Sequence, residues 1–112
     1  MMESSALRLL DRRFVSSIAD RVRMSYDTAY LARRRIWGEW CAENSRILIY
    51  PREQSSEDHI IIHEWLHVLE DVRLKVEKGF RETQIDWWAH YHLRTNPGLV
   101  KYIRGIYRAA GF

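Results

Sequence analysis

The pattern His63-Glu64-Trp65-Leu66-His67 constrains this chain more than any other stretch of its sequence. On a helix, His63 and His67 lie one turn apart on the same face, so their neutral imidazoles can share one zinc ion. Glu64 lies about 60° further round from His67, where its carboxylate can take a proton from a metal-bound water. With five histidines and nine glutamates in the chain, chance supplies roughly 0.02 matches to the pattern. We therefore predict a zinc helix here.

The apolar residues around this pattern indicate a helix face that packs into a core. They cluster on the side opposite His63 and comprise Ile61, Trp65, Val68, Leu69 and Val72. The histidine side carries Glu64 and Asp71 as well. A metal-free amphipathic helix would share the apolar face, but its second face would carry Lys, Arg and Glu. The composition of the histidine side therefore favours a metal site.

The length and composition indicate one folded domain. A chain of 112 residues is long enough for one modest core, so we predict a single domain over residues 1–112. Cys41 is the only cysteine, so the fold has no internal disulfide. No apolar run approaches the roughly 18 residues that span a bilayer, and the start of the sequence lacks the layout of a signal peptide. We expect a soluble cytoplasmic protein without a membrane partner.

The charge pattern gives little support to nucleic-acid binding. The net charge of +3 arises from 15 Arg and 3 Lys against 15 acidic residues, and the one dense basic cluster is Arg33–Arg35. Nucleic-acid-binding proteins usually show a longer basic stripe or a recognisable motif. A solvated arginine-rich surface explains the cluster better. We expect no nucleic-acid partner and keep a small basic nucleic-acid-binding domain as a minor alternative.

The sequence before the zinc helix predicts one helix and a small sheet. Apolar residues recur at three and four over residues 5–24, which is helical spacing, and residues 26–36 should contain one strand. Residues 37–41 and 46–50 have the composition of two strands joined by the polar turn 42–45. We expect a mostly antiparallel sheet of about three strands.

Two more helices are predicted after the zinc helix. Residues 80–93 follow a turn signal at 77–79, and residues 99–110 follow the breaker Thr95-Asn96-Pro97-Gly98. The predicted order is an N-terminal helix, the sheet, the zinc helix, a glutamate-bearing helix and a C-terminal helix. This order predicts an α+β domain.

A catalytic zinc site needs a third protein ligand and an open position for water. Glu82 is the best candidate for this ligand. Asp86 lies one turn further along the same helix face, where it could bond the outer N–H of a zinc-bound histidine. Ala89 on the same stripe is small enough to let the two helices approach.

The length of the zinc helix decides whether Glu82 can reach the metal. If that helix ran to Lys78, Gly79 would lie about 18 Å beyond His67 along the axis, and Glu82 could not come back. The Glu82 assignment therefore predicts a helix end near Asp71–Arg73.

The longer helix would place other residues opposite the metal. His90 or His92 would then be the third ligand. We favour Glu82 because it also gives Asp86 a role and because His90 lacks an obvious orienting partner. Asp71 could be a direct ligand, although an acid that is solvated or that bonds one of the zinc ligands is the simpler interpretation.

HEXXH followed by a helix with Glu82-Thr83-Gln84-Ile85-Asp86 resembles the gluzincin zinc peptidases. At this chain length it is most similar to the minigluzincins, and next to the ImmA/IrrE-type peptidases, which have E-x-x-A-N there. The resemblance covers about residues 46–93, and HEXXH is its specific part. It implies a zincin-like minimal core, with His63, His67 and Glu82 as ligands of one zinc ion and Glu64 as general base and acid.

The resemblance also implies a substrate site beneath a three-stranded sheet. Residues 46–50, including Ile47, Leu48 and Ile49, would form the edge strand that holds a peptide substrate in extended form. In such enzymes a histidine or tyrosine near the metal usually stabilises the oxyanion. The candidates for this role are His90, Tyr91, His92 and Tyr102.

These features predict a zinc metallopeptidase that acts on a peptide or protein substrate. Some minigluzincins are latent, and the tail Tyr107–Phe112 could likewise occupy the cleft of its own or a neighbouring molecule. Self-inhibition or self-association is therefore expected to be tail-dependent. The alternative is a non-catalytic scaffold or interaction module, whose zinc site is closed by a fourth ligand such as Asp71 or His90.

Overall fold

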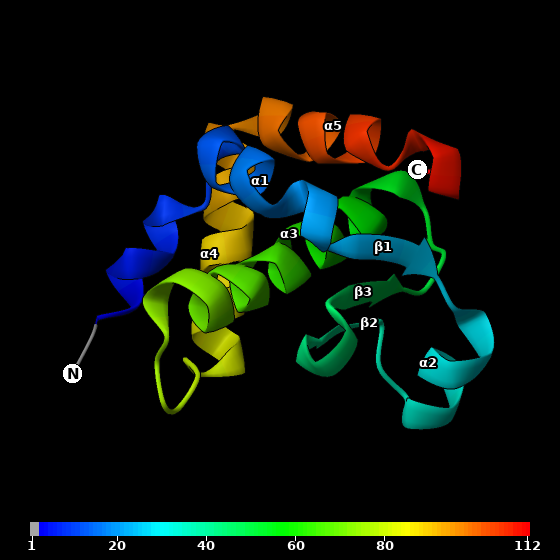
Figure 1. Ribbon diagram of the computed structural model, residues 1–112, viewed down its shortest axis with the longest axis horizontal. Coiled ribbons are helices and arrows are strands. Elements are labelled where there is room, and N and C mark those ends of the chain that lie inside the picture. The colour runs from blue at the N-terminus through cyan, green and yellow to red at the C-terminus, as the bar shows by residue number, and fades with distance from the viewer. Residues whose placement is uncertain (1–2) are drawn as a thin grey trace.

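Helix α3 (Gln54–Leu69) crosses the middle of the molecule and packs against both the sheet and the other long helices (Figure 1). The computed structural model describes residues 3–112. The α+β architecture predicted from the sequence is confirmed. The sheet lies on one side of α3 and helix α4 (Glu82–Thr95) on the other, so α3 has a different neighbour on each side.

The sheet contains three strands in the order β1-β3-β2. Their bounds are Arg23–Tyr26 for β1, Gly38–Cys41 for β2 and Arg46–Ile49 for β3. The predicted hairpin is confirmed, because β2 and β3 are antiparallel and joined by a short 3₁₀ turn, Ala42–Asn44. The sheet is mixed rather than mostly antiparallel, because β1 pairs with β3 in parallel.

Strand β3 is the central strand, so the expectation that residues 46–50 form the edge is wrong. Strand β1, which the helical spacing of residues 5–24 concealed, covers one side of β3. Ile47, Leu48 and Ile49 are buried and cannot hold a peptide in the way that the resemblance implied. The edge strand that borders the cleft is β2.

Two aspartates divide the N-terminal region differently from the predicted pattern. Asp11 accepts the Phe14 N–H at 2.8 Å and begins helix α1 (Arg12–Ile18), after a separate 3₁₀ helix, η1 (Ser4–Leu9). Asp27 accepts the Tyr30 N–H at 3.1 Å and begins helix α2 (Thr28–Arg34) where a strand was expected. Each carboxylate satisfies a backbone N–H that would otherwise lack a partner, which fixes a helix start at that residue.

Helix α3 ends early enough for the chain to turn back. After Leu69 it continues as one π-helical turn, η4 (Glu70–Leu74), and Lys75 then adopts a left-handed conformation with φ of 50°. A helix running to Lys78 is therefore wrong. The loop 75–81 leads directly into α4, which begins at Glu82.

The C-terminal region is part of the core. Helix α5 covers Pro97–Ile106, and a 3₁₀ turn, η5 (Arg108–Ala110), follows it. The Tyr107 hydroxyl donates to Val22 O at 2.6 Å, and the Phe112 ring stacks on Tyr26 with centroids 4.2 Å apart. The tail therefore packs beside β1.

Most of the predicted apolar face of α3 is buried. Ile61, Trp65, Val68 and Leu69 belong to the core, whereas Val72 is exposed because it lies in the π-helical turn. No helix among residues 3–112 is long and apolar enough to cross a membrane.

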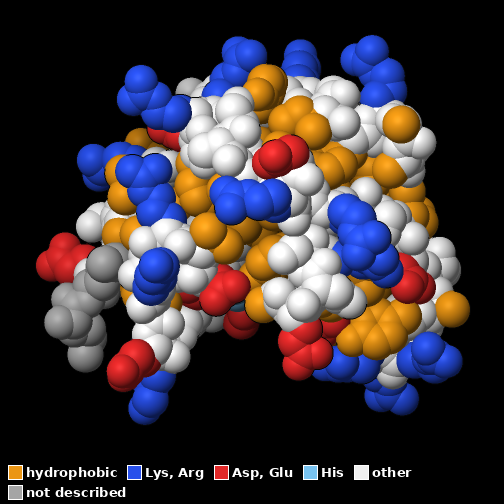
Figure 2. Space-filling model, in the orientation of Figure 1, with side chains coloured by type: hydrophobic (Ala, Val, Ile, Leu, Met, Phe, Trp, Pro, Cys, Tyr) orange, Lys and Arg blue, Asp and Glu red, His pale blue; other side chains and the backbone are white. Residues whose placement is uncertain are grey.

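Lys and Arg side chains are scattered over the face seen in Figure 2, between apolar and uncharged side chains. Of the cluster Arg33–Arg35, Arg34 forms an ion pair with Glu39 at 3.5 Å. Arg34 and Arg35 both border the cleft described below. Two of the three arginines are therefore part of a cleft wall.

Candidate metal centre

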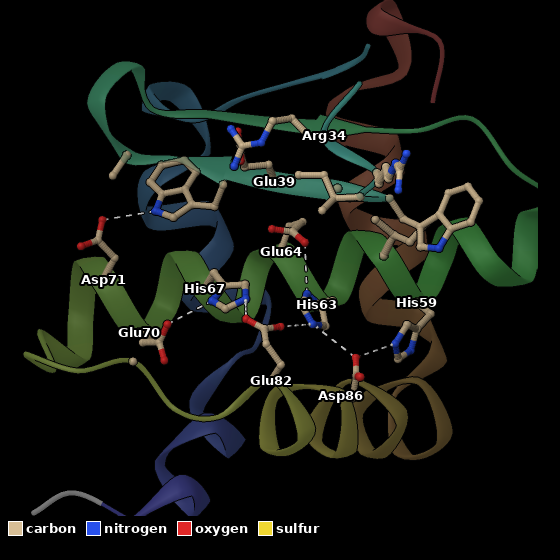
Figure 3. A pocket seen from close by; sticks show the side chains of 18 of the residues that line it. Arg34, Glu39, His59, His63, Glu64, His67, Glu70, Asp71, Glu82 and Asp86 are labelled. Atoms are coloured by element: carbon tan, nitrogen blue, oxygen red, sulfur yellow. Dashed lines mark hydrogen bonds and ion pairs between the residues drawn. The ribbon is translucent and has the colours of Figure 1, made fainter. Parts of the chain in front are cut away.

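Three side chains from two helices converge at one point (Figure 3). His63 and His67 project from adjacent turns of α3, and Glu82 is the first residue of α4. The Glu82 oxygens lie 3.0 Å from His63 Nε2 and 3.2 Å from His67 Nε2. One ligand atom from each residue lies within 4.8 Å of the other two. The structure thus brings together the three residues that the sequence analysis named as candidate ligands.

The donor set fits zinc. Two imidazole nitrogens and one carboxylate oxygen are the protein ligands of many catalytic zinc sites. Tetrahedral bonds of about 2.1 Å place ligand atoms about 3.4 Å apart. The histidine-to-Glu82 distances of 3.0 and 3.2 Å lie close to that spacing. The three side chains therefore fit a zinc ion in the type of their donor atoms and in their approximate spacing.

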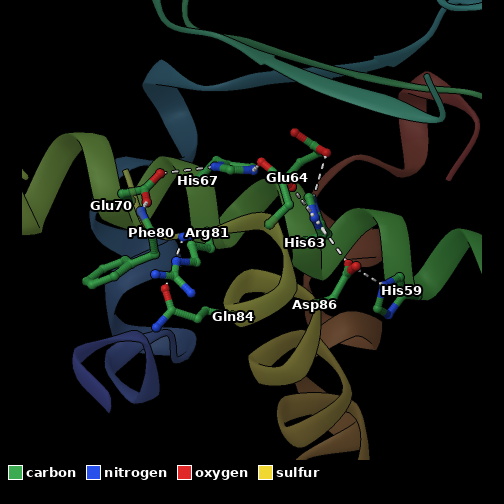
Figure 4. Close-up of polar contacts among 10 residues, drawn as sticks. His59, His63, Glu64, His67, Glu70, Phe80, Arg81, Gln84 and Asp86 are labelled. Atoms are coloured by element: carbon green, nitrogen blue, oxygen red, sulfur yellow. Dashed lines mark hydrogen bonds and ion pairs between the residues drawn. The ribbon is translucent and has the colours of Figure 1, made fainter. Parts of the chain in front are cut away.

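Glu70 contacts His67 at the ring nitrogen that does not face Glu82 (Figure 4). Its Oε1 lies 3.0 Å from His67 Nδ1, and its Oε2 accepts the Phe80 N–H. The residue is only 8% exposed. Sequence reasoning missed Glu70 and considered its neighbour Asp71, although an acid three residues after a helical histidine can face it.

His63 lies among three carboxylates. Its Nδ1 is 3.1 Å from Glu64 Oε2, and its Nε2 is 3.2 Å from Asp86 Oδ1 and close to Glu82. Burial lowers the pKa of His63, but the carboxylates outweigh this effect and leave the pKa above its ordinary value. These surroundings favour a positive charge at the point where the ligands meet.

Asp86 lies beside His63, but on a different nitrogen from the one expected. The expected partner was the outer N–H, whereas Asp86 contacts Nε2, which also faces Glu82. The same Asp86 oxygen accepts from His59 Nε2 at 3.2 Å. Burial lowers the pKa of His59 below its ordinary value in spite of Asp86. Asp86 therefore bridges two turns of α3.

A cleft of about 890 Å³ opens above the ligands. Strand β2 and the preceding residues 34–37 form one wall, and the histidine side of α3 with Glu82 and Asp86 forms the other. Glu64 borders the cleft and is 5% exposed. At the far end, Trp40 Nε1 donates to Asp71 Oδ2 at 3.2 Å, which links β2 to the π-helical turn.

A glycine lets β2 approach the general-base candidate. A Cβ on Gly38 would lie 2.6 Å from Ile60 Cγ2 and 3.2 Å from Glu64 Oε2. Real Cβ atoms essentially never come as close as the first distance. The edge strand can pass directly above Glu64 only because residue 38 has no side chain.

The expected oxyanion stabilisers lie outside the cleft. His92 is buried and donates from Nε2 to Leu7 O at 2.8 Å, so it faces η1. Tyr91 stacks on Trp87, and the Tyr102 hydroxyl bonds Ser16 Oγ. None of these three residues lines the cleft, so their predicted placement is wrong.

His90 also lies away from the three ligands. It is on the same side of α4 as Glu82 and Asp86, but it packs on His59, with ring centroids 4.4 Å apart, and does not line the cleft. The metal-ligand role considered for His90 or His92 is wrong for both histidines, because the early helix end brings Glu82 to the site instead.

The tail does not fill the cleft of its own molecule. None of residues 107–112 is among the cleft-lining residues, and Tyr107 and Phe112 contact the β1 region instead. Self-inhibition within one chain by this tail is therefore wrong. Occupation of a neighbouring molecule's cleft stays a prediction.

Comparisons with family models, curated proteins and solved structures gave no match.

Proposed function

We propose that this protein is a zinc-dependent peptidase of the gluzincin type, most similar to the minigluzincins. His63, His67 and Glu82 would hold one zinc ion, and Glu64 would act as general base and then as general acid. The observation that carries the proposal is the meeting of two His Nε2 atoms and a carboxylate beside a cleft that Glu64 borders.

The chemistry divides between the metal and Glu64. Bound zinc would supply an acidified water and polarise the carbonyl of the peptide bond. The Glu64 carboxylate would take the proton from the attacking water at an Oε atom and pass it to the leaving nitrogen. Its low exposure and its place at the cleft border support this role, because bulk water is largely kept from the carboxylate.

The edge strand β2 offers a place for an extended peptide. An edge strand presents backbone N–H and C=O groups that another chain can pair with. Gly38 brings this edge against Ile60 and Glu64, so a paired peptide would run along the base. We assign to β2 the role that the resemblance had suggested for Ile47, Leu48 and Ile49.

The scaffold alternative has less support. A closed structural site needs a fourth protein ligand. The two candidates already have other partners, because Asp71 accepts from Trp40 and His90 packs on His59. Neither of these two residues therefore closes the site in this arrangement.

The test pairs metal analysis with peptide cleavage. We expect the purified protein to bind one zinc ion and to cut members of a mixed peptide library, followed by mass spectrometry. Glu64→Gln should keep the zinc and lose at least about 100-fold in rate. Glu43→Gln, at an exposed position, is the matched control and should match wild type. Absence of zinc binding, or full activity of Glu64→Gln, would overturn the proposal.

A further inference from the structure

The loop 75–81 separates the second histidine ligand from the third ligand. Five of its residues are exposed, namely Lys75, Glu77, Lys78, Gly79 and Arg81. The Phe80 N–H near its end donates to Glu70 Oε2, which ties the loop to the π-helical turn. Since Phe80 is two residues before Glu82, this hydrogen bond acts close to the start of α4.

Glu70 contacts both sides of the metal centre at once. A carboxylate only accepts hydrogen bonds, so the contact at 3.0 Å requires a proton on His67 Nδ1. That proton leaves Nε2 as the nitrogen that can bind a metal. The other Glu70 oxygen holds Phe80. One buried carboxylate therefore orients one ligand and anchors the segment that carries the next.

The sequence leaves room for this carboxylate at Gly79. A Cβ there would lie 2.9 Å from Glu70 Oε2 and 3.0 Å from Oε1. Glu70 also begins the π-helical turn, a feature often found at functional sites. Loop 75–81, the buried Glu70 carboxylate and the π-helical turn η4 therefore meet at one place.

We propose that Glu70 is a positioning residue that couples metal binding to the docking of loop 75–81. The proposal rests on the metal site proposed above. Metal on Nε2 keeps the His67 proton on Nδ1 and so strengthens the contact with Glu70. A docked loop in turn holds Glu82 beside the histidines. Because such coupling is reciprocal, zinc should order the loop, and a loosened loop should weaken zinc binding by the same factor.

The first measurement is zinc affinity by competition with a chelator. Glu70→Gln presents an amide N–H to Nδ1, which moves the histidine proton to the nitrogen that must bind metal. We expect a loss of about 10- to 100-fold in affinity. Gly79→Ala should lose affinity too, because its Cβ displaces the carboxylate. Glu77→Gln on the same loop and Gly105→Ala, whose Cβ meets nothing within 4 Å, are the controls.

The second measurement is hydrogen exchange of the Phe80 amide with and without zinc, on variants shown by circular dichroism to be folded. Zinc should slow this exchange in wild type and much less in Glu70→Gln. The visible spectrum of the cobalt-substituted protein should also change in Glu70→Gln. Should that variant not fold, Gly79→Ala supplies the same test.

The outcomes separate the two proposals. Wild type that binds no zinc overturns the metal site and the coupling with it. Wild type that binds zinc, with unchanged affinity and unchanged Phe80 exchange in the variants, overturns only the role of Glu70. Weakened zinc binding together with faster Phe80 exchange supports the coupling.

Discussion

At Gly38 the edge strand passes α3 with no side chain between them, and a Cβ there would overlap Ile60 and crowd Glu64. Gly79 gives the same freedom to the Glu70 carboxylate. Neither glycine has a positive φ among the described residues, so space explains both of them. The candidate metal site therefore depends on the absence of a Cβ at Gly38 and Gly79 as well as on the residues that would bind the metal.

Substitution of Gly38 by alanine tests this dependence. We expect Gly38→Ala to lower the free energy of unfolding by about 1–3 kcal/mol, because β2 must move away from α3. Peptide cleavage should fall as well, since the edge strand and Glu64 shift together. Gly105→Ala in α5 should instead be neutral or stabilise by up to about 1 kcal/mol. Urea unfolding of both variants makes the comparison, and equal stability would contradict this account of Gly38.

His92 predicts a dependence of stability on pH. Burial lowers its pKa below the ordinary value, and the Leu7 carbonyl and Asp11 offset only part of this effect. The unfolded chain therefore binds a proton more readily than the folded one just below about pH 6.5, so this contribution to stability is lost as pH falls through that window. The loss from this group is at most about 1.4 kcal/mol per pH unit.

The measurement is the free energy of unfolding at pH 7.5 and 5.5 for wild type and His92→Gln. The variant keeps a side-chain donor for Leu7 O but has no group that titrates. We expect its stability to fall less between the two pH values than that of wild type. An equal fall in both proteins would show that His92 carries no such linkage.

At the element scale, the sequence predicted what periodicity and short motifs can encode. The helix with HEXXH, the β2–β3 hairpin and the break at Pro97 follow from local pattern. Strand β1 was missed because its four residues follow a helical pattern, and β3 is central only because β1 pairs with it. Pairing between strands that are distant in the sequence does not change the spacing of apolar residues within either strand, so this spacing cannot predict it.

The residues of the candidate site were likewise predicted only in part from the sequence. The spacing of the HEXXH pattern predicted His63, Glu64 and His67, and Glu82 was favoured because Asp86 lies one turn further along the same helix face. Glu70 was missed because its proposed role depends on its hydrogen bond with the Phe80 N–H, which forms only when loop 75–81 folds back against η4. The nitrogen that Asp86 contacts depends on how α4 crosses α3, which no local pattern specifies.

Helix α5 is joined to α3 by a partly buried ionic cluster. Arg104 contacts Glu57 at 3.0 Å and Asp58 at 2.7 Å, both near the start of α3. We expect Arg104→Ala to cost about 2 kcal/mol of stability, because Glu57 is buried and loses a charged partner. Arg108→Ala, at an exposed position of η5, should change stability little. Thermal unfolding compares the two, and an equal cost would contradict the role of the cluster.

At the scale of the whole molecule, α3 carries the two candidate histidine ligands and packs against strands β2 and β3, helices α4 and α5, and η1. The sheet supplies the cleft wall, α4 supplies Glu82, and α5 with the tail completes the core around Trp65. Four carboxylates, those of Glu64, Glu70, Glu82 and Asp86, gather around two imidazoles. A bound cation would relieve the repulsion among them.

Zinc should therefore stabilise the whole domain. At a free concentration 100 times its Kd, we expect a gain of about 2.7 kcal/mol, which raises Tm by roughly 10 °C for a chain of this size. Chelation should reverse the gain, and magnesium, which prefers oxygen ligands, should not reproduce it. In His67→Ala the effect of zinc should disappear. A Tm that does not respond to zinc in wild type would contradict this expectation.

The most direct test of the central claim is a crystal structure of the zinc-loaded protein, with anomalous diffraction recorded at the zinc edge. We expect one anomalous peak within about 2.0–2.2 Å of His63 Nε2, His67 Nε2 and a Glu82 oxygen, with the remaining coordination position facing the cleft. A peak bound by other residues, a peak closed by a fourth protein ligand, or no peak at this point would contradict it.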